Sequence, residues 1–536
     1  MSFEWIASHQ SAKPTTEIPL LSSADIRAIE ASTEPVIGQP GLMEQAGLAI
    51  ARWVLAQAPH AQFFWIACGN GNNGGDGAEA AIHLHRWGKT VYVSAVKSPK
   101  SAPADASRAW ARLVAEGIAV HHEAPDSWDV CIDALLGIGL QRPPEPPYAE
   151  WIKRINQAAK PTFAIDVPSG LDADTGSTFE PVVQASATLS LVGLKPGLFT
   201  HQGRDVCGDI WLHKLGTEST TEHIRCTLNP TPKPLPRPHA SHKGSFGDVA
   251  IVGGALGMQG AAVLAACAAL HAGAGRVFLA CLNSEGLQGL GIPPDIMLRS
   301  PDTLPHQGLT VVAGCGGGHD ISHQLPHWLE LAERLVIDAD ALNAIAIRPD
   351  LAQALVQRRA DTTVITPHPL EAARLLGCKT TQIQANRLDA AQRLAETFQC
   401  TVILKGSGSV IAAPGRKPRI NPTGNGRLAI GGTGDVLAGL TGTVLSQRST
   451  AWEAAAGHGV DFPAAGAAAL LPPADPTDQR PGGRSASPSA ERRARQGCGA
   501  ARRVGDALCR RASAAAERLS ARRAGWGARS GQGSRS

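Results

Sequence analysis

At 536 residues, with 43% hydrophobic and 18% charged residues, the chain has the length of two to four domains and a globular composition, which excludes a membrane-embedded or disordered class. It has no apolar run near the roughly 20 residues that span a bilayer and no secretion signal at its start, so we expect a cytoplasmic protein. Its eleven cysteines are scattered without a CxxC pair, so we expect neither disulfides nor a zinc site. The formal net charge of +4 comes from residues 461–536, which hold 14 of the 50 basic residues and six of the 46 acidic ones; the remaining chain has a net charge of −4 and does not suggest a nucleic-acid surface.

The stretch from about residue 22 to residue 215 alternates between strand and helix patterns. Apolar segments of β type occur at residues 63–67, 130–132, 163–165 and 188–192, and each is followed by a glycine-rich loop or a helical pattern. This alternation predicts an α/β domain with a parallel, doubly wound sheet. We place this domain at residues 1–216.

The strongest motif is CGNGNNGGDG at residues 68–77, directly after the first of these strands and before a helical run. Its glycines let the backbone approach a ligand closely, and the N-terminus of the following helix offers free N–H groups to a phosphate. The motif is not GxGxxG, so the usual dinucleotide-binding fingerprint fits it poorly. A tight strand–helix turn alone rarely demands two Asn and one Asp together, which favours a binding loop.

Two further polar loops follow predicted strands, DALLGIGL at residues 133–140 and DVPSGLD at residues 166–172. Loops at the carboxyl ends of parallel strands converge on one crevice, so Asp133 and Asp166 are expected to face the Asn/Gly loop. Either acid alone is more often a helix cap or a turn residue. Three polar loops at three strand ends favour a site, and their oxygen atoms also suit a hard cation.

These three motifs, in this order and spacing, resemble the NAD(P)H-hydrate epimerase domain over roughly residues 20–215. The resemblance implies a Rossmann-like fold and epimerisation at C6 of the hydrated nicotinamide ring, with Asp166 contacting the substrate as the catalytic acid or base. It implies a potassium ion held by Asn73, Asp133 and Ser169. It also implies that the substrate is held by Asn72, Asn73, Gly74, Gly75, Asp76, Gly137, Ile138, Gly139, Leu140, Gln141, Arg142 and Pro143.

Residues 217–240 are rich in Thr and Pro and have no period, which is typical of a linker. A second α/β domain is expected at residues 241–460. Alanine-rich helices such as 261–271 and 370–376 separate its strands. The strands are predicted at residues 248–252, 276–280, 310–313, 335–337, 363–366 and 401–404.

The sequence GGTGD at residues 431–435 precedes an apolar helical run. The N–H groups of its glycines, together with the helix dipole, would surround the negative charge that develops on a transferred phosphoryl group. Asp435 can accept a proton from an attacking hydroxyl. The alternative is an Asp that only caps the helix after a flexible loop, which is common for Asp alone.

Three weaker signals follow other strands of the second domain. KGSGS at residues 405–409 is well placed for nucleotide phosphates, although many turns look like it. His368, between two prolines, is a substrate contact or only a turn residue. Asp338 and Asp340 could line the cleft or position a magnesium-bound water.

The segments SHKGSFGDVAIVGG, GMQGAAVLAACAALHAGAGRV, DADALN, TPHPLEA and GGTGDVLAGL resemble the ADP/ATP-dependent NAD(P)H-hydrate dehydratase branch of the ribokinase-like fold, from residue 241 to about residue 460. The resemblance implies Mg²⁺-assisted phosphorylation of the ring hydroxyl by ADP, then loss of phosphate, which regenerates NADH or NADPH and yields AMP. Ala261, Gly316, His368 and Asp435 would meet the hydrate. The adenine nucleotide would meet Lys405, Gly406, Ser407, Gly408, Ser409 and Gly434.

The chain departs from this family pattern in two places. The family's GPGLG loop is GCGGG here, at residues 314–318, and the family's closing helices do not follow residue 460. Residues 461–536 are rich in Arg and Ala without periodicity, which indicates a disordered tail or a reading frame lost near residue 461. Arg without Lys favours the lost frame. We expect the missing helices to expose apolar packing and to lower the stability of the second domain.

Two other hypotheses remain open from the sequence. One is a ribokinase-like small-alcohol kinase with an N-terminal regulatory domain, which would use ATP and release a phosphorylated product. The other makes the first domain a non-catalytic binding module, although a pure binder has no need of Asp133 and Asp166 in intact loops. For the hypothesis that the two resemblances favour, we expect hydrated NADH or NADPH and ADP as the only partners, apart from further copies of the chain in a homo-oligomer.

Overall fold

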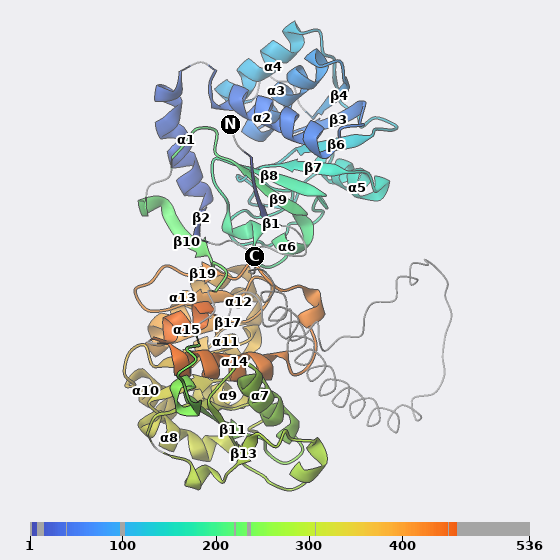
Figure 1. Ribbon diagram of the computed structural model, residues 1–536. Helices are drawn as coiled ribbons and strands as arrows, with labels where there is room; N and C mark the ends of the chain where they lie inside the picture. The colour runs from blue at the N-terminus through green and yellow to red at the C-terminus, as the bar shows by residue number, and fades with distance from the viewer. Residues whose placement is uncertain are drawn as a thin grey trace, which may run out of the picture.

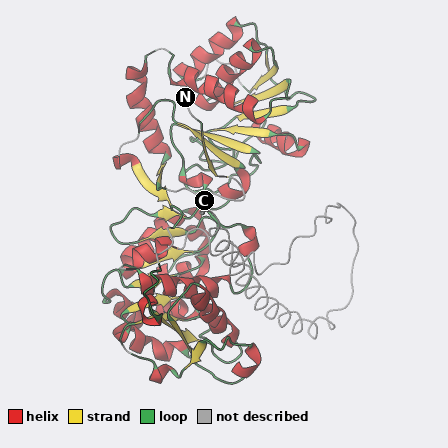
Figure 2. Cartoon of the chain, in the orientation of Figure 1, coloured by secondary structure: helices red, strands yellow, loops and turns green. Residues whose placement is uncertain are grey.

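The computed structural model describes residues 3–7, 16–38, 40–96, 102–218, 221–232, 237–305, 307–448 and 450–457. Within them the chain forms two halves stacked end to end, each a mainly parallel sheet covered by helices (Figures 1 and 2). The predicted α/β class with two sheets is confirmed. The predicted tail at residues 461–536 lies outside the described residues. In the described part, no helix combines the length and the apolar character needed to cross a membrane.

The sheet of the first half has the strand order β1-β9-β8-β7-β6-β3-β4-β5 in the described residues, and every neighbouring pair except β1 and β9 is parallel. The order reverses between β3 and β6, and open α/β sheets bind ligands beyond the carboxyl ends of the strands at such a point. The strands are β1 (Glu4–Ala7), β3 (Phe63–Cys68), β4 (Thr90–Ala95), β5 (Val120–His121), β6 (Val130–Ala134), β7 (Thr162–Ile165), β8 (Ala187–Leu191) and β9 (Asp209–His213).

Helices cover both faces of this sheet, which explains why β3 is an unbroken apolar run. Its Phe64 and Ile66 face a cluster formed with α2, α3 and α4, whereas Trp65 faces Trp151 of α5 on the other side. The longer helices of this half are α1 (Ser23–Ile37), α2 (Leu42–Gln57), α3 (Asn72–Arg86), α4 (Ala104–Ala115) and α5 (Tyr148–Ala158).

Helix α3 starts at Asn72, inside the motif that we expected to be a loop as far as residue 77. Its glycines serve close packing. A Cβ on Gly74 would lie 1.9 Å from the carbonyl oxygen of Gly69, and one on Gly77 would lie 2.6 Å from the Cβ of Ala134. The expectation that the loop extends to residue 77 is therefore wrong, because tertiary packing overrides the low helix propensity of glycine.

The crossing of α2 and α3 is equally tight at Gly47, where a Cβ would lie 2.1 Å from the Cβ of Glu79. We expect Gly47→Ala to lower the free energy of unfolding by about 1–3 kcal/mol, the usual effect of overpacking a core. Gly260→Ala is the control, because nothing lies within 4 Å of its added Cβ and its stability should be unchanged or slightly higher. Denaturant titration measures both, and equal stabilities would contradict the prediction.

The second sheet has the order β13-β12-β11-β14-β15-β16-β17-β18-β19-β10-β2 in the described residues, and it is parallel from β13 to β17. Here the order reverses between β11 and β14. The strands are β11 (Asp248–Gly253), β12 (Arg276–Cys281), β13 (Ile296–Leu298), β14 (Leu309–Ala313), β15 (Arg334–Ile337), β16 (Thr363–Ile365), β17 (Thr401–Leu404), β18 (Val410–Ala412), β19 (Arg419–Ile420), β10 (Ile224–Leu228) and β2 (Ile18–Leu21).

Two groups of helices enclose the second sheet. One face is covered by α7 (Gln259–His271), α14 (Thr433–Gln447) and α15 (Ala451–Gly457), whose buried residues share one hydrophobic cluster. The other face is covered by α8 (Ile321–Leu331), α9 (Asp340–Ile347), α10 (Pro349–Val356), α11 (Pro369–Leu376), α12 (Thr380–Ala385) and α13 (Arg387–Phe398).

The segment that we expected to be a linker contains strand β10, which pairs in parallel with β19 and antiparallel with β2. The prediction of an irregular stretch throughout residues 217–240 is therefore wrong for residues 224–228. Strand β2, from near the start of the chain, thus extends the sheet of the second half (Figure 1). A hydrophobic cluster spans this junction and includes Leu198 and Phe199 from one half and Ile420 from the other.

Candidate functional site

The candidate site of the first half includes a buried carboxylate, Asp133, near the end of β6. Its Oδ1 accepts a hydrogen bond of 2.6 Å from the Ser169 hydroxyl, and its Oδ2 accepts one of 2.8 Å from the Ser169 N–H. Burial raises the pKa of the Asp133 carboxyl to about 6, although these hydrogen bonds oppose the shift. The structure therefore brings together two of the three residues predicted to hold a cation.

The third predicted cation ligand, Asn73, lies in the first turn of α3 and is 9% exposed. Its Nδ2 is buried without a hydrogen-bond partner. Since rotation of the Asn73 amide by half a turn exchanges its nitrogen and oxygen, the flipped amide would present an oxygen here instead. A Cβ on Gly137 would lie 3.3 Å from the Cβ of Asn73, so the loops after β3 and β6 meet here.

The rest of the predicted substrate loop, residues 137–143, lies at the rim of this crevice. Gly139 and residues 141–143 are exposed, and the carbonyl of Ile138 accepts a 3.3 Å hydrogen bond from Arg27 of α1. Leu140 N–H closes a turn onto the carbonyl of Gly137 at 3.2 Å. The contact of these residues with a substrate stays a prediction.

Asp166 follows β7 with a left-handed backbone angle, φ +68°, which is uncommon for a residue with a side chain. Its Oδ1 accepts hydrogen bonds from the Leu191 N–H, at 3.0 Å, and from the ammonium of Lys195. Lys195 is fully buried and also donates to the Ser190 hydroxyl and the Leu191 carbonyl. The sequence analysis missed Lys195; its only signal is a single cation in the apolar run SLVGLKPGLF.

Two further carboxyl groups stand in the electrostatic field of Asp166. Burial and the charge of Asp166 raise the pKa of Glu30, on α1, to about 7. Burial, with Asp166 and Glu30, also raises the pKa of Asp76 well above its usual value. Glu30 was not among the predicted residues, since nothing in α1 distinguishes it from a surface acid. The site thus gathers four acids and one buried lysine, and among them Glu30, with a pKa of about 7, can take up or release a proton near neutral pH.

In the second half, the loops after β11 and β14 interlock at the point where the strand order reverses. Ala255 N–H donates to the Gly316 carbonyl at 2.7 Å, and Gly254 N–H donates to the Cys315 carbonyl at 3.0 Å. Gly316 has φ +56°, and a Cβ there would lie 2.9 Å from the Cβ of Ala261. The predicted residues Ala261 and Gly316 therefore lie against each other.

A buried ion pair lies at the candidate site of the second half. The Lys405 ammonium lies 2.5 Å from Oδ1 of Asp338 and 3.9 Å from Oε2 of Glu371. Thr366 donates its hydroxyl to the same Oδ1 at 2.7 Å. Burial alone would lower the pKa of Lys405, but the charges of Asp338 and Glu371 raise it, so Lys405 is a fixed positive charge.

Asp435 lies at the third position of α14, above this ion pair. Its carboxylate, the Asp338 carboxylate and the Cys315 sulfur lie within 4.8 Å of one another. Burial and the charge of Asp338 raise the pKa of Asp435, and a hydrogen bond from Cys315 opposes this. A Cβ on Gly434 would lie 3.4 Å from the Lys405 ammonium, so the first turn of α14 rests on the lysine.

His368 is the N-cap residue of α11 rather than a free side chain. Its Nδ1 accepts hydrogen bonds from the N–H groups of Leu370 and Glu371, at 3.1 and 3.2 Å, and Glu371 Oε2 accepts from the His368 N–H at 2.7 Å. The side chain is still 45% exposed. His368 is thus a structural cap, and its contact with substrate stays a prediction.

Glu371→Gln should flatten the pH dependence of stability between pH 4.5 and about 7. Burial, opposed by Lys405, raises the pKa of Glu371 from 4.5 to about 7. Because the folded state holds this proton more tightly than the unfolded state, the stability is highest below pH 4.5 and is lost as the pH rises to about 7. Gln keeps the acceptor but does not titrate. Thermal unfolding of both proteins across this range measures the difference, and parallel curves would contradict it.

The predicted nucleotide loop, residues 405–409, follows β17 and has two glycines with positive φ, Gly406 and Gly408. Gly406 and Ser407 are exposed, and the Ser409 hydroxyl donates to the Gly406 carbonyl at 3.2 Å. The loop is therefore open on one side. On its other side it contacts the first half of the chain.

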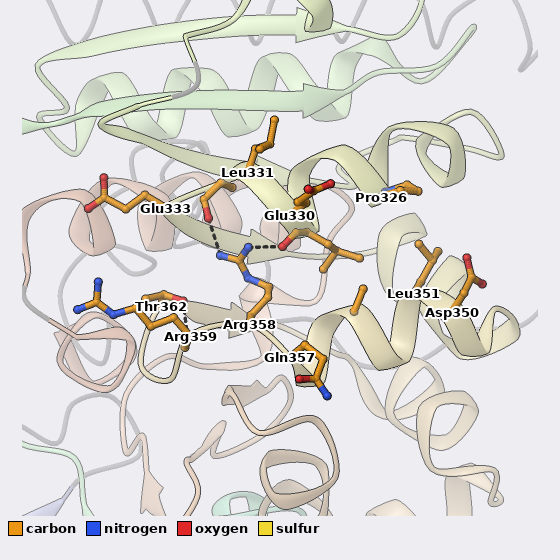
Figure 3. A pocket seen from close by; sticks show the side chains of 13 residues that line it. Pro326, Glu330, Leu331, Glu333, Asp350, Leu351, Gln357, Arg358, Arg359 and Thr362 are labelled. Atoms are coloured by element: carbon orange, nitrogen blue, oxygen red, sulfur yellow. Dashed lines mark hydrogen bonds between the residues drawn. The ribbon is translucent and has the colours of Figure 1, made fainter.

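A separate pocket of about 610 Å³ lies between α8 and α10, and none of the predicted site residues lines it (Figure 3). Figure 3 shows the Arg358 guanidinium pointing at carbonyl groups near the end of α8, where it donates to Leu329 at 2.7 Å and to Ala332 at 2.8 Å. These carbonyls have no partner within the helix, so Arg358 acts as a structural cap. The pocket is not part of the candidate site in either half.

Comparisons with known proteins match two separate segments of the chain to two families. Residues 40–197 match the family model of the YjeF-related protein N-terminus, and residues 249–473 match that of NAD(P)H-hydrate dehydratase. The chain is 36% identical to the bifunctional NAD(P)H-hydrate repair enzyme of Escherichia coli over 83% of this chain and 89% of the relative. It is 37% identical to that of Vibrio cholerae, over 76% and 84%.

A solved structure that the chain is similar to is an ADP/ATP-dependent NAD(P)H-hydrate dehydratase from Bacillus subtilis co-crystallized with ATP and Mg²⁺. The two are 28% identical over 47% of this chain and 87% of that chain, with a TM-score of 0.37. The family assignment depends on the sequence matches instead, which extend through both halves. By its two matched segments and its near full-length relatives, the chain belongs to the family of bifunctional NAD(P)H-hydrate repair enzymes.

Proposed function

We propose that each half of the chain carries out one step in the repair of hydrated nicotinamide cofactors. The first half, residues 1–216, interconverts the C6 epimers of hydrated NADH and NADPH. The second half, residues 241–460, dehydrates the S epimer with ADP as the phosphoryl donor and releases AMP and phosphate. The main support is that, in each half, aspartates lie beside glycine-rich backbone near the point where the strand order reverses, which is where open α/β sheets bind ligands.

In the first half, Asp166 is the proposed acid or base. Lys195 fixes its carboxylate by a buried ion pair, and Asp166 itself has a left-handed backbone angle that is uncommon for a residue with a side chain. The acids Glu30 and Asp76, with raised pKa values, supply a second place for the proton. Epimerisation moves protons without a net gain or loss, so a crevice that stores a proton suits it.

Asn73, Asp133 and Ser169 are the residues proposed to hold K⁺. They fit the ion because all three offer oxygen atoms, Asp133 Oδ2 accepts a single hydrogen bond, and the buried amide of Asn73 has an unpartnered nitrogen whose place its oxygen can take. Bound K⁺ would add positive charge beside the substrate and keep nearby carboxylates ionised.

In the second half, Asp435 removes the proton from the ring hydroxyl as its oxygen bonds to the transferred phosphoryl group. The raised pKa of Asp435 makes it a stronger base for this step. The N–H groups of the first turn of α14 and the ammonium of Lys405 stabilise the negative charge. Loss of phosphate together with a ring proton then restores the reduced cofactor.

Mg²⁺ would be held through water by the carboxylates of Asp338 and Asp435. Mg²⁺ prefers oxygen ligands, and Oδ2 of Asp338 remains available to it because Lys405 and Thr366 both bind Oδ1. The ion would neutralise charge on the phosphates of ADP.

The test is to incubate the full-length protein with a mixture of hydrated NADH epimers, ADP, Mg²⁺ and K⁺. We expect the absorbance of the reduced ring to return for both epimers, with release of AMP and inorganic phosphate. When Li⁺ replaces K⁺, epimerisation should slow, so that only the S epimer is converted rapidly to NADH. A requirement for ATP together with a stable phosphorylated alcohol would instead identify a small-alcohol kinase and contradict the proposal.

A further inference from the structure

The loop proposed to bind ADP, residues 405–409, is held from behind by the first half of the chain. His201 N–H donates to the Ser407 carbonyl at 3.0 Å, and the Ser407 hydroxyl donates to the His201 carbonyl at 2.8 Å. A Cβ on Gly408 would lie 2.1 Å from the carbonyl oxygen of Phe199. The two backbones are thus in direct contact at residues 199–201.

Arg204, in the short helix α6 (Gly203–Val206), holds a second loop of the same crevice. Its guanidinium donates to three successive carbonyls, those of Pro422 at 3.2 Å, Thr423 at 3.1 Å and Gly424 at 2.7 Å. These carbonyls directly precede the glycine-rich segment that leads into α14 and Asp435. Burial lowers the pKa of Arg204, yet no arginine loses its charge at neutral pH.

Both contacts come from residues 199–204, which follow a buried, well-packed stretch. Leu198 and Phe199 share a hydrophobic cluster with Ile420 of the second half. The loops that they hold are rich in glycine, and glycine loses more conformational freedom on ordering than any other residue. A loop that is ordered before the ligand arrives binds more tightly, because the ordering need not occur at binding.

We infer that residues 199–204 of the first half form part of the nucleotide site of the second, with Arg204 as the positioning residue for ADP. Arg204 does not touch the nucleotide; it keeps residues 422–424 and, with the His201–Ser407 pair, the loop at 405–409 in the shape that binds it. This inference rests on the proposed dehydratase function. It assigns the epimerase half a second task besides its own chemistry.

The experiment is calorimetric titration of the full-length protein with ADP in the presence of Mg²⁺, without the hydrate. We compare the unaltered protein with Arg204→Met, Arg204→Lys and the control Arg154→Met. Arg154 also donates to a backbone carbonyl, that of Pro125, but within the first half. We expect the Kd for ADP to rise roughly tenfold in Arg204→Met, within the usual range of coupling between sites, to rise less in Arg204→Lys, and to stay unchanged in Arg154→Met.

Steady-state kinetics distinguish a role of Arg204 in positioning the ADP loops from general damage to the fold. In Arg204→Met the KM for ADP should rise while kcat at saturating ADP and the epimerase rate stay close to those of the unaltered protein. Arg204→Lys, which keeps the charge and one donor, serves if the Met variant does not fold. Equal ADP affinity in the Arg204 variants and the unaltered protein would overturn the inference alone, whereas no ADP binding by the unaltered protein would overturn the proposed function and this inference with it.

Discussion

Asp435→Asn should lower the dehydratase rate by roughly 10²–10⁴-fold, the usual effect of losing a general base. The amide keeps the shape of the side chain and still accepts the hydrogen bond from Cys315, but it cannot take the proton of the ring hydroxyl. We expect the epimerase rate to change little, because the residues proposed for epimerisation, in the first half, are untouched. The rate of return of reduced-ring absorbance from the S epimer measures the effect.

Asp389→Asn is the matched control for this change. Asp389 occupies the third position of α13, as Asp435 does in α14. Both changes therefore remove an acid whose negative charge stabilises the N-terminus of its helix. Asp389 is exposed and pairs with Arg393 on the surface. A similar loss of activity in both variants would mean that Asp435 acts through helix stability and would refute its role as a base.

Asp166→Asn should lower the epimerase rate by a similar factor, roughly 10²–10⁴-fold, while the S epimer is still dehydrated. This change also leaves the fully buried ammonium of Lys195 without a countercharge. Breaking a buried ion pair from one side destabilises a protein by about 3–5 kcal/mol. We therefore expect a lower unfolding temperature as well as the loss of activity.

The double variant Asp166→Asn with Lys195→Met separates these two effects. Removing the unpaired ammonium should restore much of the lost stability, because neither charge then remains buried. The epimerase rate should stay low. Recovery of epimerisation along with stability would show that Asp166 only holds the fold, and the assignment of the acid or base in the first crevice would be withdrawn.

The strands that the sequence predicts best are those buried on both faces. Strand β3 is an apolar run of six residues, and β11 contains four consecutive aliphatic residues, Val249–Val252, so their pattern identifies them directly. Strand β10 was missed because only Cys226 and its next two residues are buried, and its partners β2 and β19 lie far away along the chain. A strand of this kind is specified by its pairing, which no local pattern reveals.

The sites show the same difference between local and distant signals. The glycine-rich motifs predict the loops and their aspartates, and Asp133 with Ser169 meets as expected. Lys195 and Glu371 were missed, since a single charged residue has no signature until the fold buries it beside a partner. The start of α3 at Asn72 was missed because a local signal misled: its glycines are typical of a loop, whereas here they are needed because neighbouring backbone leaves no room for a side chain.

The strand supplied by residues 18–21 has a practical consequence for anyone who wishes to study the two activities apart. A fragment beginning near residue 217 would keep β10 but lose β2, so one edge of its sheet would expose unsatisfied amide and carbonyl groups. Such a fragment is prone to self-association, and a failure to recover soluble material would say nothing about its chemistry. Point substitutions in the intact polypeptide are the sounder way to silence one activity and retain the other.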